Sequence, residues 1–422
     1  MSTTRGWTLG ETVRAAPRWA RIYLPSSGLD GLVEALWLFT LGWEASRAGS
    51  ASGLVLAAGA VPSIAFVLWG GSLADRLGAH RVAVWTMLAR VLILGAWAAI
   101  LVTDAAPAYL AAAVAFATGS VAGIHDPAVS ALPRLLVPAA ALETTTNAQR
   151  ICIRLVQTAG PSLGGLIAGW FGVGTVGVVA AAVGLLPLAG YAALRRTPAP
   201  QIDQPSSADL HHGGGAGSSG SLWAGFQWIR KDPVVRRTLP VQGVVNLTTA
   251  SILMAALPSQ ARAYGWGAET YGLAAGAFGA GMLLGSLAAF GIRSRAPRRK
   301  LAVAVSCAAL ASVMVAVTGS AVSAPLAIAA AGLMGLMIGP VGSVLTGWTM
   351  AASARSDPTT YGRVYAVLLL VTVAGEPLGF VIFSGLASIT STATTAIIFG
   401  SAGLIVAMFA LAARAVWVGQ AG

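Results

Sequence analysis

The sequence is poor in charged residues, in acids above all, and in the side chains from which catalytic and metal sites are built. Charged residues make up 9% of its 422 residues, acidic residues number 14, histidines 4 and cysteines 2. Because a soluble protein of this size needs many more charges on its surface, this composition excludes a water-soluble globule. Cys152 and Cys307 both fall in apolar segments, where we expect packing residues and no disulfide.

In place of charge the chain has long apolar runs. Hydrophobic residues make up 56% of the sequence, and the charged residues fall between apolar stretches of about 20 residues, the length that crosses the hydrocarbon core of a bilayer. These runs predict twelve membrane-spanning helices and therefore an all-α polytopic membrane protein. We expect the spans at residues 22–45, 52–74, 82–103, 107–125, 145–170 and 173–194, and at 238–261, 269–292, 300–319, 324–348, 360–386 and 393–415.

The twelve spans fall into two sets of six, which predicts two pseudo-symmetric six-helix bundles. The sequence Gly-Ser-Leu-Ala at 71–74 returns at 285–288, each time followed by basic residues. We expect an N-terminal bundle over 1–194, a cytoplasmic linker over 195–237 and a C-terminal bundle over 238–422. Aromatic residues lie beside basic ones at 222–237, a composition that suits an interfacial helix on an anionic leaflet.

The positive charge of the chain, +12 at pH 7, indicates its topology. No basic helix with interleaved aromatic residues points to nucleic acid, so we expect no such partner. If the N-terminus is inside the cell, almost every arginine and lysine outside the spans is cytoplasmic, and Arg47 and Arg262 lie on the opposite side. High alanine, with arginine preferred to lysine, suggests a bacterial source. We therefore predict a multi-pass protein of a bacterial cytoplasmic (inner) membrane with both termini in the cytoplasm.

Residues 71–81, Gly-Ser-Leu-Ala-Asp-Arg-Leu-Gly-Ala-His-Arg, form a short charged turn between two apolar runs. The segment resembles the signature G-x-L-x-D-R-x-G-R-[KR]-[KR] of the major facilitator superfamily, between its second and third helices. Ala79 and His80 depart from that pattern, and the matching positions are Gly71, Leu73, Asp75, Arg76, Gly78 and Arg81. The resemblance, which covers essentially the whole chain, implies a conformational latch on the cytoplasmic side. Its residues are Gly71, Asp75, Arg76, Gly78 and Arg81, and a plain turn without a latch is the alternative.

A second motif lies in the fifth span. Gly160-Pro161-Ser162-Leu163-Gly164-Gly165 is similar to the G-P-x-x-G-G motif of the superfamily's antiporters. The resemblance implies a hinge between the halves at Gly160, Pro161, Gly164 and Gly165, and ordinary packing of small residues is the alternative. Segments 26–30, 132–135, 362–364 and 377–379 are similar to the macrolide- and enterobactin-exporter branch. Together these motifs resemble the drug:proton antiporters of the superfamily.

Two carboxylates in the first span carry the most informative chemistry. Asp30 and Glu34 lie four residues apart, hence on one helix face inside the membrane. Because two ionised acids there are costly, at least one should hold a proton near neutrality, as proton-coupled transport requires. They would also attract a cationic substrate, for which Trp37, one turn further, offers a π face. The alternatives are a structural Asp30 that caps a broken first helix and a carboxyl that is simply neutralised.

Buried arginines in the third and fifth spans need acidic partners. Asp126, at the inner end of the fourth span, is one candidate partner of Arg90 and Arg154, and Asp75 and Glu143 are others. Such a charge network either breaks and reforms during transport or remains static.

For the other candidate residues inside the spans, the sequence leaves two roles open. Glu376, before Pro377, either couples protons or makes a structural hydrogen bond. Gln242 and Asn246, four residues apart, either bind substrate or bridge helices. Met337 either lines an adaptable cavity or packs.

Taken together, the sequence predicts a proton-coupled secondary transporter that exports amphiphilic small molecules, such as a drug, antibiotic or siderophore, by alternating access. We expect it to work as a monomer in the lipid bilayer, with no cofactor or metal and with the proton gradient as driving force. An uptake porter for a nutrient or lipid-like metabolite is the first alternative, and a non-transporting membrane scaffold or sensor is the second. An enzyme is not expected, because the sequence has no Cys/His metal cluster, phosphate-binding glycine loop or nucleophile–base pair on a span.

Overall fold

The computed structural model describes residues 18–102, 107–136, 139–194, 222–291, 297–356 and 361–412. These ranges are almost entirely helical, and no strand occurs among them. The predicted fold class, an all-α polytopic membrane protein with two six-helix halves, is confirmed. Most of the predicted linker, residues 195–221, and both ends of the chain lie outside the described residues.

Six long helices form the first half. A short 3-10 turn, η1 (Ser46–Ala51), joins the first two of them. The helices α5 and α6 are longer than the spans expected at 107–125 and 145–170, because the helical backbone continues beyond the apolar run that crosses the bilayer. The six are α2 (Arg18–Ala45), α3 (Ser52–Leu77), α4 (Ala79–Val102), α5 (Ala108–Leu136), α6 (Ala139–Phe171) and α7 (Val173–Leu194).

The second half repeats this plan, with two of its spans interrupted. The π-helical turn η2 (Ile252–Ala256) links α10 (Pro233–Ser251) to α11 (Leu257–Ala263), directly before Pro258. The span expected at 360–386 is broken at Ala374, three residues before Pro377, which cannot donate a helical hydrogen bond. The other helices are α12 (Gly267–Gly291), α13 (Pro297–Gly319), α14 (Ala324–Ser356), α15 (Tyr361–Val373), α16 (Gly375–Ile389) and α17 (Thr392–Ala412).

Membrane crossings can be counted from the helices themselves. Among the described residues, 11 helical stretches are long and apolar enough to cross a bilayer. The first stretch, Trp19–Val67, contains both α2 and most of α3, which are separated by a sharp turn at Gly49 (φ 55°, ψ −120°). When these two helices are counted separately, the twelve predicted crossings are all present.

A short helix, α9 (Leu222–Lys231), precedes the second half and packs on it. Its Ile229 is buried against Val235, Val364 and Val367 of α10 and α15. Asp232 then begins α10, because its Oδ1 accepts hydrogen bonds from the backbone N–H groups of residues 234 and 235, both at 2.9 Å. The basic residues of α9, Arg230 and Lys231, are exposed, as expected for an interfacial helix.

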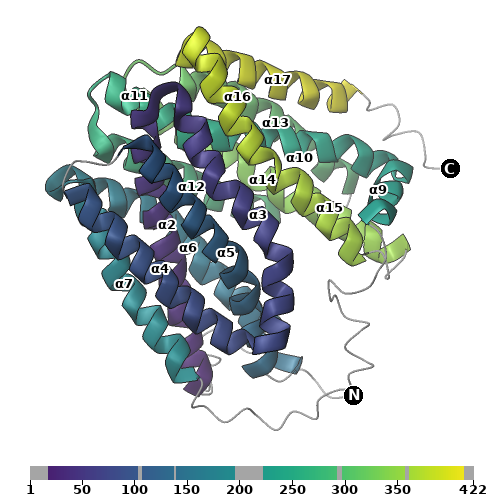
Figure 1. Cartoon of the computed structure of the whole chain (residues 1–422). Coiled ribbons are helices and arrows are strands. Elements are labelled where there is room, and N and C mark those ends of the chain that lie inside the picture. Colours follow the sequence, from purple (N-terminus) through teal and green to yellow (C-terminus); the bar gives the residue numbers. More distant parts are fainter. Residues whose placement is uncertain are drawn as a thin grey trace.

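The two halves lie side by side and meet at one end (Figure 1), which we name the closed end. The helices α6 and α12 approach closely there, since a Cβ atom on Gly165 would lie 2.7 Å from the Cα of Gly272. The Ser162 hydroxyl also donates to the Gly272 carbonyl at 3.4 Å. This contact continues as far as Thr158 and Gly279. One turn beyond, Arg154 of α6 is exposed, so the halves part toward the opposite end.

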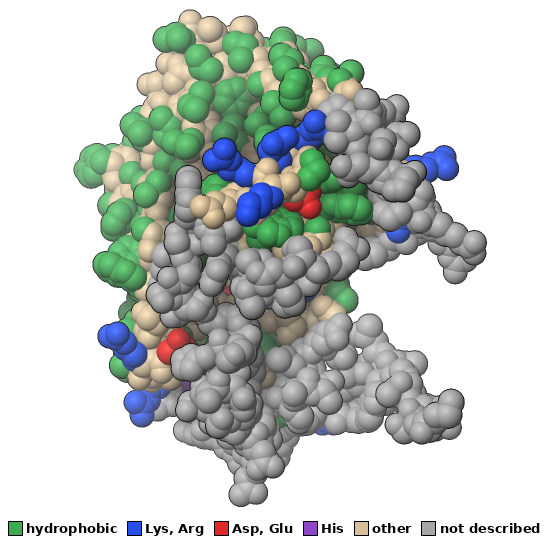
Figure 2. Space-filling view, turned by 90° about the vertical axis from the view of Figure 1, so that its right-hand side faces the viewer, with side chains coloured by type: hydrophobic (Ala, Val, Ile, Leu, Met, Phe, Trp, Pro, Cys, Tyr) green, Lys and Arg blue, Asp and Glu red, His purple; other side chains and the backbone are tan. Residues whose placement is uncertain are grey.

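Exposed basic residues mark that opposite end, which we name the basic end. It carries Arg76 and Arg81 around the α3–α4 turn, Arg230 and Lys231 on α9, and Arg299 on α13. Figure 2 shows Lys and Arg side chains gathered on this side of the molecule, while hydrophobic side chains cover the surface above them. One charged end and an apolar belt are what a bilayer requires of the protein surface.

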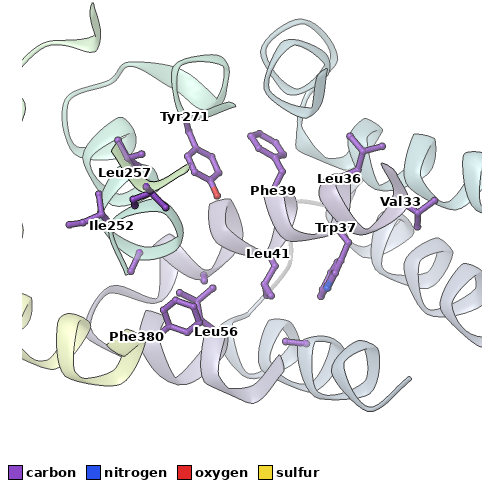
Figure 3. Packing of buried hydrophobic residues seen from close by; sticks show 14 of the residues in the cluster. Val33, Leu36, Trp37, Phe39, Leu41, Leu56, Ile252, Leu257, Tyr271 and Phe380 are labelled. Atoms are coloured by element: carbon purple, nitrogen blue, oxygen red, sulfur yellow. The ribbon is translucent and has the colours of Figure 1, made fainter. Parts of the chain in front are cut away.

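Buried apolar side chains from both halves form a shared core near the closed end (Figure 3). The ring of Phe39 on α2 stacks on that of Tyr271 on α12, with centroids 5.1 Å apart and planes at 17°. The ring of Trp43 also stacks with that of Tyr271, at 6.4 Å and 19°. Because these rings come from different halves, this stack stabilises the closed arrangement.

Candidate functional site

Four helices of the first half bring polar side chains together at Asp30 on α2. One carboxylate oxygen of Asp30, Oδ1, accepts a hydrogen bond from Nη1 of Arg90 on α4 at 3.1 Å. The other, Oδ2, lies 2.8 Å from Nε2 of His125 on α5 and accepts from the Tyr191 hydroxyl on α7 at 3.2 Å. Arg90 and His125 are only 2% and 1% exposed. With Glu34, these residues form what we name the acid–base cluster.

Glu34 connects the acid–base cluster to its surroundings. Its carboxylate forms an ion pair with Nη2 of Arg90, so one guanidinium bridges two acids that lie one helical turn apart. The Glu34 side chain is 30% exposed, whereas that of Asp30 is 11% exposed. Glu34 is therefore the member of the cluster through which water or a ligand has access.

His125 has a hydroxyl partner on its second ring nitrogen. Nδ1 lies 2.7 Å from the Thr86 hydroxyl, which also lies 2.6 Å from the carbonyl of Val82 in its own helix. When Nδ1 is unprotonated, the hydroxyl donates to Nδ1; when Nδ1 carries a proton, the hydroxyl accepts from it and donates to the carbonyl. The ring can thus gain or lose a proton while every partner remains hydrogen-bonded.

The charges of the acid–base cluster do not balance without one added proton. With His125 neutral, the carboxylates of Asp30 and Glu34 face the single guanidinium of Arg90. A net negative charge in an apolar region of a membrane protein is costly, and one proton on His125 or on a carboxyl removes it. A role of these residues in proton coupling stays a prediction.

The structure corrects part of the predicted charge network. Arg90 pairs with Asp30 and Glu34, not with Asp126. Asp126 is exposed, although it is close enough to interact electrostatically with Arg90 and the rest of the cluster. Successive helical residues point about 100° apart, so α5 turns His125 into the cluster and Asp126 away from it. Arg154 is likewise exposed rather than buried.

Trp37, predicted to offer a π face to a substrate, is only 4% exposed. It lies within the apolar core, where Figure 3 shows it with Leu36 and Leu41. Sequence reasoning missed three residues here: His125 and Tyr191 of the cluster, and Thr86, the hydroxyl partner of His125. His125 carried a usable signal, since it is one of 4 histidines in the chain and lies inside an apolar span beside an aspartate. The other two are uncharged and gave none.

The glycine–proline motif lies in α6 and packs on two helices at once. Gly160 faces Ala35 of α2, and a Cβ on Gly164 would lie 2.9 Å from the ring of Phe39. Gly165 faces Gly272 of the other half, as described above. These residues and Pro161 thus lie where α6 contacts both its own half and its partner, and a hinge role stays a prediction.

At the basic end, the predicted latch segment is a tight turn. Helix α3 ends at Leu77, Gly78 has φ +88°, and α4 begins at Ala79, with the Arg81 amide 3.0 Å from the Gly78 carbonyl. Asp75, Arg76 and Arg81 are exposed. A Cβ on Gly71 would meet open space, so the close backbone approach expected at Gly71 is absent in this conformation. The latch itself stays a prediction.

In the second half, a cavity of about 180 Å³ lies between α10, α14 and α15. Gln242 and Asn246 line it, and whether they bind substrate stays a prediction. Met337 is outside the lining and packs against the main core, while its neighbour Ile338 takes that place. Glu376 lies in the first turn of α16, one turn beyond Thr372 of the lining, and is partly buried.

A further charged group joins the halves at the closed end. Arg262 on α11 donates from Nε to the Ser46 hydroxyl at 2.6 Å and from Nη2 to the Trp43 carbonyl at 2.9 Å. Its guanidinium carbon lies 4.2 Å above the Trp43 ring, and Nη2 lies 3.5 Å from Glu44. We name this group the Arg262 clasp; the sequence placed Arg262 on that side of the membrane but not its partners.

Two six-helix halves, the first of which holds a charged cluster among its apolar helices, are the architecture of a multi-pass membrane protein. Residues 24–356 match the model of the Major Facilitator Superfamily, and the chain belongs to that family. No curated protein matches it in sequence.

Solved structures of similar fold cover nearly the whole chain. The nucleoside transporter NupG has a TM-score of 0.70 and 14% identity, over 94% of this chain and 99% of that one. A D-xylose-proton symporter has a TM-score of 0.64 and 15% identity, over 93% and 97%. A bacterial homologue of the human lysosomal transporter Spinster, in an inward-facing and unoccupied conformation, has 0.67 and 13%, over 94% and 96%. At such identities the likeness concerns the fold.

Proposed function

We propose that this protein is a proton-coupled secondary transporter that exports a small amphiphilic molecule by alternating access. The observation that carries the proposal is the acid–base cluster, in which two carboxylates share one arginine and a histidine has partners on both nitrogens. Such a cluster binds one proton at low energetic cost and is strained when the proton leaves. Coupled transport requires a site of this kind.

In this mechanism the proton exchanges between His125 and Asp30, which are in contact, while Arg90 stays a permanent cation paired with both carboxylates. Protonated His125 makes the cluster neutral, and both carboxylates stay paired with Arg90. When the proton is lost through the accessible Glu34 side, the two carboxylates carry more negative charge than Arg90 balances. They then attract Arg90 more strongly, and this force acts between α4 and α2. Because α2 also packs on α6, at Ala35 and Phe39, the movement reaches the contact between the halves.

The sidedness follows from charge. The exposed arginines and lysines of the basic end support a cytoplasmic location for that end. With the closed end held by the Arg262 clasp, the space between the halves then faces the cytoplasm, the state from which an exporter loads its substrate. The resemblance of residues 160–165 to the antiporter motif supports export.

An uptake porter is the second candidate. The solved structures of similar fold include a nucleoside transporter and a D-xylose-proton symporter. Two such halves can move a proton and a substrate in the same direction or in opposite directions. The apolar cavity wall of the second half favours an amphiphile over a sugar, because a sugar needs a polar partner for each hydroxyl.

One experiment on the purified full chain in proteoliposomes separates these possibilities. A thermal-unfolding screen with drugs, siderophores, nucleosides and sugars first selects a radiolabelled ligand. We expect the ligand to accumulate when the vesicle lumen is acidic, and a protonophore to abolish the accumulation, as for an antiporter in either orientation. Accumulation with an acidic exterior would instead make the protein a symporter. Transport that ignores the pH gradient would refute proton coupling, and ligand binding without any transport would favour a scaffold or sensor.

A further inference from the structure

The cavity of the second half has an unusual chemical lining. It lies between α10, α14 and α15, and all of its lining residues are uncharged. Its walls include Val245, Ile338 and Leu368, and its polar groups include Gln242, Asn246 and Thr346. A volume of about 180 Å³ is sufficient for a ring or a branched chain of several carbon atoms, but not for a whole drug-sized ligand.

One polar group of this cavity has an unmet hydrogen-bonding need. Gln242 is 4% exposed, and its Oε1 accepts from the Thr346 hydroxyl at 3.2 Å, yet its buried Nε2 has no hydrogen-bond partner among the described residues. If the positions assigned to Oε1 and Nε2 are exchanged, Oε1 instead of Nε2 lacks a hydrogen-bond partner. Buried donors in proteins are normally paired, and a ligand is a common partner where the protein has none. Asn246, four residues along the same face of α10, offers a second amide to the same cavity.

We infer that this cavity is a subsite for the neutral, hydrogen-bond-accepting part of the transported molecule, such as an amide, ester or ketone carbonyl on an apolar ring or chain. The inference rests on the proposed function, since it takes the ligand to be the transported one. Among the described residues of the lining, a cationic group finds no acid to pair with, and an anionic group finds no arginine or lysine. Amide donors from Gln242 and Asn246 suit a carbonyl oxygen, and the aliphatic walls suit the carbons beside it.

This subsite separates two tasks between the halves. The first half holds the proton in the acid–base cluster, and the second half holds uncharged substrate. The substrate therefore does not need a positive charge with which to bind the carboxylates. Proton and substrate are coupled through the movement of the halves and do not compete for binding to Glu34. The expected substrate is a neutral amphiphile, which differs from the cationic one that the two carboxylates alone suggest.

The test uses ligand-induced thermal stabilisation of the full chain in detergent. The probes are neutral aromatic amides and esters, their pure hydrocarbon counterparts, and the permanent cation tetraphenylphosphonium. We expect the carbonyl-bearing probes to bind more tightly than the hydrocarbons and the cation. Gln242→Leu should weaken their binding by roughly tenfold, because the substitution removes the amide donor from the cavity.

Thr372→Val is the matched control. Thr372 lines the same cavity, but its hydroxyl already donates to the Leu368 carbonyl at 2.8 Å, so its loss should leave probe binding unchanged. Unaltered carbonyl binding in Gln242→Leu, or equal loss in the control, would overturn the subsite. Preferential binding of tetraphenylphosphonium would overturn the neutral-substrate assignment. Glu34→Gln separates a failure of the subsite from a failure of the proposed function. If this variant loses gradient-driven transport but still binds the probes, the proposed function is supported, whatever the result for Gln242→Leu.

Discussion

Nε2 of His125 lies 2.8 Å from Oδ2 of Asp30, while Nδ1 of the same ring lies 2.7 Å from the Thr86 hydroxyl. The histidine is thus held between a carboxylate and a hydroxyl that can either donate to Nδ1 or accept from it. Histidine is the side chain whose charge changes most readily near physiological pH. This pairing makes His125 the expected carrier of the proton within the cluster.

Replacing the histidine by an amide should uncouple transport. In His125→Gln the side chain can still hydrogen-bond Asp30 but cannot carry the proton. We expect gradient-driven accumulation to fall by at least about tenfold and the dependence of transport on pH to flatten, while thermal stabilisation by the ligand persists. Thr86→Val, which removes only the hydroxyl, should shift the pH profile without abolishing transport. An unchanged pH profile in His125→Gln would mean that the proton travels elsewhere.

Removing the shared cation should destabilise the fold. Arg90→Met leaves Asp30 and Glu34 without a counter-ion inside the first half, and breaking a buried ion pair in this way costs about 3–5 kcal/mol. The unfolding temperature in detergent should therefore drop clearly. The double variant Arg90→Met with Asp30→Asn should recover part of the loss, because it removes one of the stranded charges. If the single variant unfolds like the wild type, the ion pairs do not hold the four helices together.

The Arg262 clasp should control the closed end. Arg262→Ala removes two hydrogen bonds, an ion pair and the stacking on Trp43 that join α11 to the end of α2. In a background with Cys152 and Cys307 replaced by serine, we expect a cysteine at Ser384, which lies against Gly53 across the halves, to be labelled several-fold faster by a membrane-impermeant maleimide. Arg47→Ala is the control, since Arg47 pairs with Glu44 inside one half. Equal labelling in both variants would show that the Arg262 clasp does not control access at the closed end.

Close packing of α6 on α12 should be needed for closure. A Cβ on Gly165 would lie 2.7 Å from the Cα of Gly272, so even alanine must displace backbone. We expect Gly165→Ala to lower the transport rate and to raise the same cysteine labelling. Gly95→Ala in α4, where a Cβ meets nothing within 4 Å, should transport normally and gain up to about 1 kcal/mol of helix stability. Normal transport by Gly165→Ala would show that this approach is not part of the cycle.

The course of the chain through the membrane was predictable because a single physical quantity, the length of an apolar run, determines it. The start of α7 at Val173 and the end of α13 at Gly319 coincide with the expected ends. The extension of α6 back to Ala139 was not expected, because a helix that leaves the bilayer no longer needs an apolar sequence.

The site was predictable only where a residue is anomalous by itself. Asp30, Glu34 and Arg90 are charges inside apolar spans, so each was identified from the sequence. Which acid meets Arg90 depends on how α2, α4 and α5 turn toward one another, and that rotation is a tertiary property. For the same reason Thr86 and Tyr191, both ordinary in a membrane helix, became functional candidates only when the helices were placed.

The central claim is that the cluster needs one exchangeable proton because Asp30 and Glu34 share Arg90. In Glu34→Gln the remaining carboxylate and guanidinium balance with His125 neutral, so the need for the proton disappears. The most direct measurement compares gradient-driven accumulation with exchange of labelled for unlabelled substrate at equal pH, in wild-type and Glu34→Gln proteoliposomes. The account predicts that Glu34→Gln loses accumulation and keeps exchange at close to the wild-type rate. Accumulation at the wild-type level in that variant would contradict it.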